Sequence, residues 1–407
     1  MIRPQLKHVR HPLRTAAAVW GLLGMHFDIW KFGQLSNHRY RGDSRFDLNN
    51  VSLGFAPRLE ASSADVDLLR RICTAYKRAV EDERFAPKAY QASGWWRQVR
   101  SASLGPVMRA LENDDIESLR TIYSNFYRNP CSTGLVGVPY GKADAFFSGK
   151  INNLYRSFYL GDALHTLDYW KKQTGSAYSL QDLGGPDVGN PFGILLDGVL
   201  VRSGSAYQHY TASKVISCLG STPSTVVEIG GGFGGMAYYL LRDQAHVKYI
   251  DFDVPESLAL TSYYLIRSFP HLNFLLYGED DLSPDAVYRA DVALMPTYAM
   301  DSLASESADV VFSSHAMSDI SPEAMAAYVP AIARITTDCF LYMGDAKGIR
   351  SMEALVDQHL HGLQLQALKH TRWNSHRCPD AEEVECVFKP LPTPEAQPAS
   401  IPVSLSS

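Results

Sequence analysis

The sequence contains little cysteine, and none of it stands in a pattern that binds metal. Six cysteines are scattered over 407 residues without a CxxC pair or a Cys/His cluster of zinc-finger spacing. In a chain of this length such cysteines are typical of reduced thiols in a cytosolic protein, so we expect a cytoplasmic location. No tight ligand motif supports a metal site, and a divalent ion held by Asp and His side chains is kept only as an alternative.

A surplus of positive charge and a long apolar run are also missing. The chain has 38 Lys and Arg against 43 Asp and Glu, a net charge of −5, so we expect no nucleic-acid partner. No apolar run approaches the roughly 20 residues of a transmembrane segment. The nearest, residues 16–25, follows several basic residues and indicates an amphipathic packing helix, with a membrane-surface anchor or a signal peptide as alternatives.

The length predicts two domains, or one large domain with an extension. Helical periodicity at residues 64–80 and 107–127 predicts a mainly helical N-terminal region over residues 1–150. A connecting segment, which we expect to form a substrate wall, covers residues 151–219, with a hairpin at 192–201 and a helix at 207–219. The Pro- and Ser-rich tail, residues 391–407, is expected to be disordered.

Residues 220–390 have a different sequence pattern, in which short apolar runs alternate with helical segments. This pattern predicts an α/β domain with a doubly wound, mostly parallel sheet. We expect strands at residues 226–229, 247–252, 273–277, 292–295, 310–312 and 339–343, and a closing antiparallel pair at 363–368 and 384–388.

A glycine-rich turn follows the first of these strands and fits two patterns. Gly230, Gly232 and Gly235 match the dinucleotide pattern GxGxxG, whereas Glu228, Gly230, Gly232 and Gly234 match acid-x-G-x-G-x-G. A carboxylate at the end of an apolar strand needs a partner, and an ammonium group is a suitable one. A pyrophosphate gains nothing from a neighbouring anion. The acid therefore favours a cationic ligand such as S-adenosylmethionine (SAM).

The next strand ends with two acids on the same face, Asp251 and Asp253. An acid about 20 residues after a glycine turn is placed to accept hydrogen bonds from ribose hydroxyls. We assign this role to Asp253, at the end of the strand, with capping of the following helix as the alternative.

The runs EIGGGFGGMAYYLLR (228–242) and DFDVPESLALTSYYL (251–265) resemble the bacterial sugar O-methyltransferases, which are class I SAM-dependent methyltransferases. The FD-x-P element also resembles small-molecule O-methyltransferases of the caffeate and polyketide type. The resemblance spans roughly residues 120–390. It implies a Rossmann-like domain in which Glu228, Gly230, Gly232 and Gly234 hold the methionine part of SAM and Asp253 holds the ribose.

Polar residues beyond other strand ends are the candidates for catalysis. In an open α/β sheet ligands bind beyond the carboxyl ends of the strands, so the glycine turn, Asp253, residues 313–315 and residues 344–345 should face one crevice. Residues 315–319 resemble the HDWSD element of plant-type O-methyltransferases, whose His is the base, although Ala316 and Met317 depart from it. His315 is the candidate base, since imidazole titrates near neutral pH; a substrate-binding or structural His is the alternative. Asp319 is the second catalytic candidate, or caps a turn.

Substrate-binding candidates lie at two further places. Tyr207, His209 and Tyr210 stand on a predicted helix just before the first strand of the sheet, where segments often close over SAM in this superfamily. Asp345 follows a later strand and could orient His315, bind a substrate hydroxyl or hold a metal ion. Packing roles are the alternative for the helix residues.

The sequence thus predicts a SAM-dependent O-methyltransferase acting on a hydroxyl of a sugar or glycosylated metabolite, with a small-molecule or glycan acceptor as partner. Three alternatives stay open: methylation of a phenolic or polyketide hydroxyl, a nicotinamide-dependent oxidoreductase that uses the GxGxxG-like turn, and a SAM-binding module without activity. The helical N-terminal half is expected to form a cap, a substrate wall or the surface of a homo-oligomer.

Overall fold

The structure, a computed structural model, describes residues 12–58, 65–92, 94–138, 143–220, 223–280, 283–318, 320–346 and 362–391. Its largest sheet is made of β3 (Ser224–Ile229), β4 (Val247–Asp253), β5 (Phe274–Leu276), β6 (Val292–Pro296), β7 (Ala308–Ser314), β8 (Thr336–Asp345), β9 (Leu363–Thr371) and β10 (Glu383–Pro390). The order across the sheet is β5-β6-β4-β3-β7-β8-β10-β9. β10 runs antiparallel to β8 and β9, and the other pairs are parallel.

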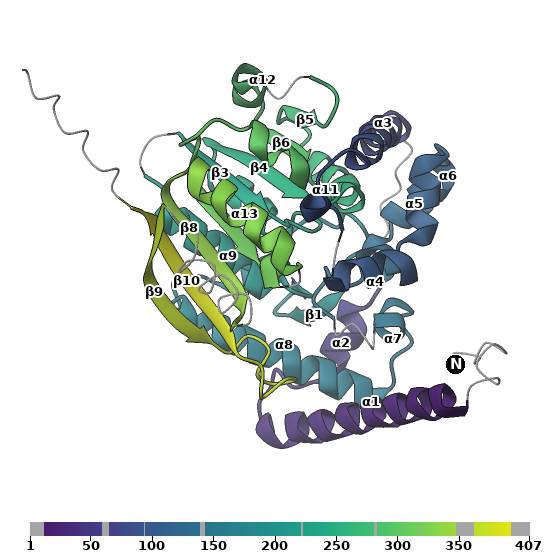
Figure 1. Cartoon of the computed structure of the whole chain (residues 1–407). Coiled ribbons are helices and arrows are strands. Elements are labelled where there is room, and N and C mark those ends of the chain that lie inside the picture. The colour runs from purple at the N-terminus through teal and green to yellow at the C-terminus, as the bar shows by residue number, and fades with distance from the viewer. Residues whose placement is uncertain are drawn as a thin grey trace, which may run out of the picture.

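Helices cover both faces of this sheet (Figure 1), which confirms the predicted Rossmann-like α/β fold. One hydrophobic core includes side chains of α9 (Ser205–Cys218), α10 (Gly235–Asp243) and α11 (Pro255–Ser268). A second core includes side chains of α12 (Pro284–Arg289) and α13 (Pro322–Ile335). Along β3, Val226 belongs to the first core and Val227 to the second, because successive side chains of a strand point to opposite faces. A strand buried on both faces has the continuous apolar run that made it recognisable in the sequence.

The N-terminal region is helical, as predicted, but one predicted helix is divided. The described elements are α2 (Leu48–Gly54), α3 (Val66–Glu83), α4 (Gly94–Ala102), α5 (Gly105–Glu112), α6 (Ile116–Tyr123) and α7 (Ala143–Phe147). The helix expected over residues 107–127 is interrupted between α5 and α6, where Asp114 has a φ of 52°. Asp115 then begins α6, since its side chain accepts a hydrogen bond from the Ser118 amide at 3.1 Å.

The connecting segment contains the predicted hairpin, formed by β1 (Gly193–Leu196) and β2 (Val199–Arg202) around an Asp197-Gly198 turn. The first hydrophobic core extends from N-terminal side chains such as Ile29, through the hairpin, to the sheet and Trp373. The division at residues 150 and 219 stays a prediction.

A long first helix, α1 (Pro12–Arg39), lies along α8 (Asn153–Gln173) at one end of the molecule (Figure 1). The two backbones approach closely at Gly161, where a Cβ atom would lie 2.0 Å from Ser36 Oγ. Ser36 Oγ is also 2.9 Å from His376 Nε2, so α1 contacts the loop before β10. No helix in the described ranges is long and apolar enough to span a bilayer. The tail predicted to be disordered lies, apart from Leu391, outside those ranges.

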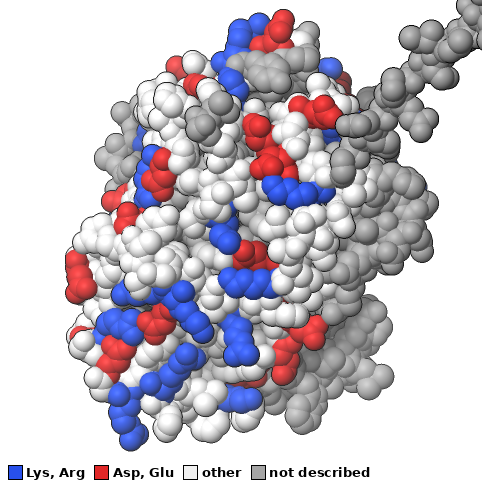
Figure 2. Space-filling model, turned by 90° about the vertical axis from the view of Figure 1, so that its left-hand side faces the viewer, with Lys and Arg blue, Asp and Glu red and all other residues white. Residues whose placement is uncertain are grey.

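The side of the molecule bordered by β9 carries charge of both signs. Figure 2 shows Lys and Arg side chains interspersed with Asp and Glu over this face. One ion pair there joins β10 to β8, with Lys389 Nζ 2.6 Å from Asp338 Oδ1.

Candidate functional site

Two adjoining cavities open at the carboxyl ends of β3 and β7, of about 420 Å³ and about 170 Å³. From β3 the chain proceeds to β4 on one side, while β7 pairs with β3 on the other side, so this is the point where the strand order reverses. Such switch points are where open α/β sheets bind ligands. The larger and the smaller cavity meet at a boundary lined by Gly134, Leu135, Gly230, Gly232, Ser314 and His315.

The glycine turn lies at this boundary, and its backbone leaves no room for side chains. Gly230, Gly232 and Gly234 have φ values of 79°, 68° and 85°, in the left-handed region that favours glycine. A Cβ atom on Gly230 would lie 2.2 Å from the Cβ atom of Ala316. Gly230 and Gly232 line both cavities, whereas Gly234 forms the N-cap of α10. A ligand can therefore approach the backbone of the turn closely.

Three buried acids stand behind the turn, at the ends of β3 and β4. Glu228 Oε2 accepts a hydrogen bond from the Tyr249 hydroxyl at 2.5 Å. Asp251 Oδ1 accepts from the Gly231 amide at 3.0 Å, and Asp253 Oδ2 accepts from the Gly232 amide at 2.9 Å. The two aspartates therefore tie the glycine turn to β4 and fix its shape.

Burial raises the pKa of each of these acids. The pKa of Glu228 rises to about 8 and that of Asp253 to about 7, and in both cases the main cause is burial. The pKa of Asp251 is raised well above its ordinary value by burial and by the two neighbouring carboxylates. Within the described residues no Lys or Arg pairs with these acids, and Asp251 Oδ2 has no hydrogen-bond partner. The site is thus short of positive charge, which a cationic ligand would supply.

The acids reach different cavities. Glu228 lines the larger one, and Asp253 lines the smaller one together with Trp96 of α4, Thr297 and Met317. Glu228 could therefore hold an ammonium group while Asp253 accepts hydrogen bonds from ribose hydroxyls on the other side of the turn. This arrangement fits the cofactor that the sequence predicts.

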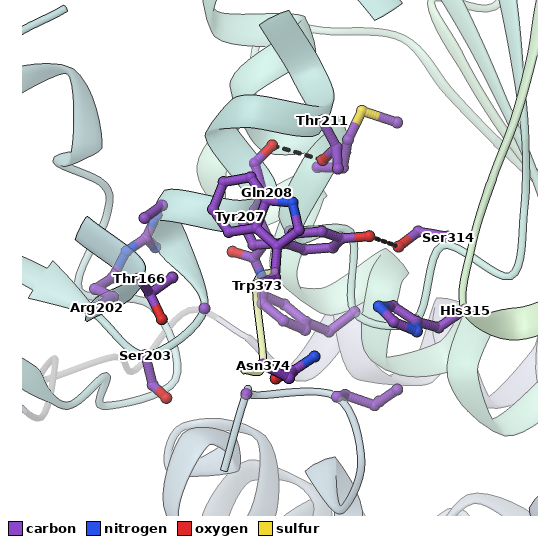
Figure 3. Close-up of a pocket in the computed structure, with 18 of the residues that line it drawn as sticks. Thr166, Arg202, Ser203, Tyr207, Gln208, Thr211, Ser314, His315, Trp373 and Asn374 are labelled. Carbon is purple, nitrogen blue, oxygen red and sulfur yellow. Dashed lines mark hydrogen bonds between the residues drawn. The ribbon is translucent and has the colours of Figure 1, made fainter. Parts of the chain in front are cut away.

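His315 stands where the cavities meet, directly after β7. Its φ is 54°, a conformation that costs a non-glycine residue about 1–3 kcal/mol and that occurs often at functional sites. Its backbone amide donates to the Met343 carbonyl at 2.9 Å, which holds the residue at the strand end. The imidazole points into the cavity (Figure 3).

Tyr207 is the one predicted helix residue that lines a cavity. Its hydroxyl lies 2.8 Å from Ser314 Oγ (Figure 3). Gln208 and Thr211 line the same cavity. His209 and Tyr210 point elsewhere: the Trp170 indole donates to His209 Nδ1 at 3.2 Å, and the Tyr210 hydroxyl donates to Glu385 Oε2 at 2.6 Å.

The structure therefore does not bring His209 and Tyr210 to either cavity. Residues four apart on a helix share a face, and the face of α9 that carries Tyr207 and Thr211 lines the cavity. Asp345 also lines neither cavity. Its backbone amide and carbonyl bond to the hydroxyls of Ser318 and Tyr342 at 3.2 Å and 2.8 Å at the end of β8. Asp319 lies outside the described residues.

Sequence reasoning missed a second wall of the larger cavity. Asp162 of α8 lines it, as do Trp373, Asn374 and Arg377 from the loop between β9 and β10. Arg377 Nη1 lies 3.3 Å from Asp162 Oδ2. The one sequence signal for this wall is a single acid within an otherwise apolar stretch of α8, residues 158–164. No group of three or more His, Cys, Asp or Glu side chains in the described ranges is arranged to hold a metal ion.

Comparison with known proteins gives fold neighbours only. No family model matches the chain, and no curated protein matches it. Among solved structures, the chain is similar to geranyl diphosphate methyltransferase in complex with SAM (9% identity, 45% of this chain and 85% of that one, TM-score 0.31). It is also similar to TrmN from Thermus thermophilus (10% identity, 45% of this chain and 49% of that one, TM-score 0.31). It is likewise similar to the cyclase SpnF (10% identity, 46% of this chain and 82% of that one, TM-score 0.32). These values are too low to indicate an activity or a substrate.

Proposed function

We propose that the protein is a SAM-dependent O-methyltransferase that acts on a hydroxyl group of a sugar or glycosylated metabolite. The observation that carries this proposal is Glu228. It is a buried carboxyl group at the end of β3, it lines the larger cavity, and no positive side chain in the described part of the chain pairs with it. A buried acid of this kind favours a cation.

The two cavities suggest how the cofactor would lie. Glu228 would hold the ammonium group in the larger cavity, and Asp253 would hold the ribose in the smaller one. Gly230 and Gly232 line both, so a ligand that spans the two cavities would cross their backbone. His315 also lines both cavities, which puts it beside the point where the reacting centre would lie.

In the proposed reaction the protein aligns the acceptor hydroxyl with SAM and removes the proton of that hydroxyl. SAM would supply a methyl group on a cationic sulfur; transfer to the acceptor forms an O–C bond, breaks the S–C bond and leaves S-adenosylhomocysteine. His315 would accept the proton of the acceptor hydroxyl through a ring nitrogen. Tyr207, whose hydroxyl lies 2.8 Å from Ser314 Oγ, would line the same cavity and help to fix the acceptor.

The same acids argue against a nicotinamide cofactor. A pyrophosphate on the glycine turn would lie beside Glu228, Asp251 and Asp253, and like charges repel. Protonation of these acids would weaken the repulsion, but the amides of Gly231 and Gly232 would still donate to Asp251 and Asp253 and not to a pyrophosphate.

Calorimetric titration with SAM and, separately, with NADH tests the cofactor. We expect SAM to bind at micromolar concentration, NADH not to bind, and Glu228→Gln to weaken SAM binding. Asp338→Asn, which removes an exposed acid on β8, is the matched control and should bind SAM as the native protein does. NADH binding without SAM binding would overturn the proposal. Release of S-adenosylhomocysteine on addition of a glycoside acceptor tests the activity and excludes an inactive SAM-binding module.

A further inference from the structure

The first half of α1 extends past the start of α8, the helix on which the second half of α1 packs. Gly33 of α1 lies against Leu154 in the first turn of α8, where a Cβ atom on the glycine would be 3.0 Å from Leu154 Cδ1. Ser36 of α1 lies against Gly161, about two turns further along α8. Both helices therefore run in the same direction, and residues 12–28 of α1 precede the start of α8 (Figure 1). At the ordinary helical rise this part of α1 is about 25 Å long.

Two large apolar side chains near the middle of α1 are exposed to solvent. Phe27 is 59% exposed and Trp30 is 52% exposed, and their ring centroids lie 5.8 Å apart. Ile29 and Phe32, on the other side of the helix, are buried in the first hydrophobic core. The helix therefore has a second apolar face, and neighbouring exposed aromatic rings are typical of a surface that binds a partner or a membrane.

The sequence continues the face of Phe27 toward the start of the helix. Positions three or four apart lie on one face of a helix, and a row of apolar residues precedes Phe27 at this spacing: Leu13, Ala16, Trp20 and Leu23. The positions on either side of this row are uncharged too, since residues 15–27 contain no Lys, Arg, Asp or Glu. A seam between two helices is usually bordered by charged positions, whereas a helix that is apolar all round fits a lipid environment.

The charge of this segment has one sign. Residues 1–27 contain four Lys and Arg and no Asp or Glu, although the whole chain has a net charge of −5. The four bases precede the uncharged run, at Arg3, Lys7, Arg10 and Arg14. Anionic lipid headgroups attract such a cluster, whereas the same cluster on a second copy of the chain does not. The charge therefore favours an anionic membrane over a second copy as the partner of this face.

We propose that the first half of α1 binds the surface of an anionic membrane, with Phe27 and Trp30 at the boundary between headgroups and acyl chains. Tryptophan is enriched at this boundary in membrane proteins. No helix in the described ranges is long and apolar enough to span a bilayer, so α1 lies in the plane of the surface. The same helix continues into the core at Ile29 and Phe32, which joins the membrane-binding segment directly to the folded protein. This inference does not depend on the proposed function.

Co-sedimentation of the full-length protein with vesicles tests the proposal. One set of vesicles is made of phosphatidylcholine, and the other also contains about 30% phosphatidylserine. We expect the partition coefficient to be at least about 10-fold higher for the vesicles with phosphatidylserine, because the basic segment is attracted to their negative surface. Addition of about 0.5 M NaCl should remove most of this difference, since salt screens the attraction.

Two pairs of substitutions separate the apolar and the charged contributions. Phe27→Ser combined with Trp30→Ser should lower the partition coefficient about 100-fold, because two large apolar side chains no longer enter the membrane. Phe85→Ser is the matched control, since Phe85 is 85% exposed and follows α3, away from α1; it should bind vesicles as the native protein does. Arg10→Gln combined with Arg14→Gln should weaken binding to the phosphatidylserine vesicles about 10-fold and leave binding to phosphatidylcholine unchanged.

Four results would overturn the proposal. They are absence of binding to either kind of vesicle, equal binding to both kinds, unchanged binding in the protein with Phe27→Ser and Trp30→Ser, and an equal loss of binding in Phe85→Ser. Sedimentation velocity without vesicles identifies the competing partner. A native oligomer that Phe27→Ser and Trp30→Ser convert to a monomer, in a protein that binds no vesicles, would assign this face of α1 to a second copy of the chain.

Discussion

We expect the buried acid at the end of β3 to make the proposed SAM binding depend on pH. Burial raises the pKa of Glu228 to about 8 in the free protein. At about pH 6 only about one Glu228 side chain in 100 is then ionised, and at about pH 7.5 about one in four. An ammonium ligand selects the ionised form. If binding returns the pKa to its ordinary range, the apparent affinity should rise about 20-fold between these pH values, equivalent to about 1.8 kcal/mol.

Calorimetry over this pH range, in buffers of different ionisation enthalpy, measures both the affinity and the proton released on binding. Glu228→Gln keeps an acceptor for the Tyr249 hydroxyl but cannot ionise, so its affinity for SAM should be weak and nearly independent of pH. Tyr249→Phe removes a hydrogen bond that lowers the pKa of Glu228, and should shift the rise in affinity to higher pH. An affinity for SAM that is flat with pH in the native protein, or an unchanged rise in Glu228→Gln, would show that Glu228 does not meet the ammonium group.

Three further predictions follow from the same site. His315→Asn should lower kcat by about 100- to 10,000-fold with little change in the Kd for SAM, because Asn tolerates the left-handed backbone but supplies no base; an unchanged turnover number would exclude His315 as the base. Gly230→Ala should abolish SAM binding and lower the free energy of unfolding, since its Cβ atom would lie 2.2 Å from that of Ala316; normal binding by calorimetry and normal stability in urea would contradict the shape of the turn. The pKa of Glu228 in the folded protein, about 8, lies above the ordinary 4.5, so the stability it contributes is fully present below about pH 4.5 and is lost as the pH rises through 8. Urea unfolding without cofactor should show that the free energy of unfolding falls over this pH range. Glu228→Gln should reduce this fall. The same dependence on pH in both proteins would argue against a buried ionisable Glu228.

Local patterns were enough to predict the sheet. Strands buried on both faces have short apolar runs, so β3, β7 and β8 stand out from the helices between them, and in β4 apolar residues are interspersed with Lys248, Asp251 and Asp253. The division between α5 and α6 was missed although residues 112–115, Glu-Asn-Asp-Asp, interrupt the apolar period between Leu111 and Ile116. Asp115 caps a new helix there, and an acid at that place in a helical pattern also fits an exposed helix position.

The candidate site was predictable where its residues follow the carboxyl ends of strands that the sequence predicts, as His315 does. Glu228, Asp251 and Asp253 stand on adjacent parallel strands, so spacing alone predicts that they meet. Asp162 and Arg377 are 215 residues apart, and their contact depends on how α8 packs against the loop before β10. The side of α9 that faces the cavity depends equally on tertiary packing, and spacing alone does not predict that Tyr207 lines the cavity while His209 does not.

The close approach of α1 and α8 at Gly161 links the start of the chain to one wall of the larger cavity. Ser36 of α1 contacts His376, which directly precedes Arg377, and burial lowers the pKa of His376 to about 4, so the contact stays uncharged at neutral pH. The N-terminal helix thus supports this wall from outside the cavity. We therefore expect sequence change in α1 to alter this wall while the glycine turn and the acids behind it stay unchanged.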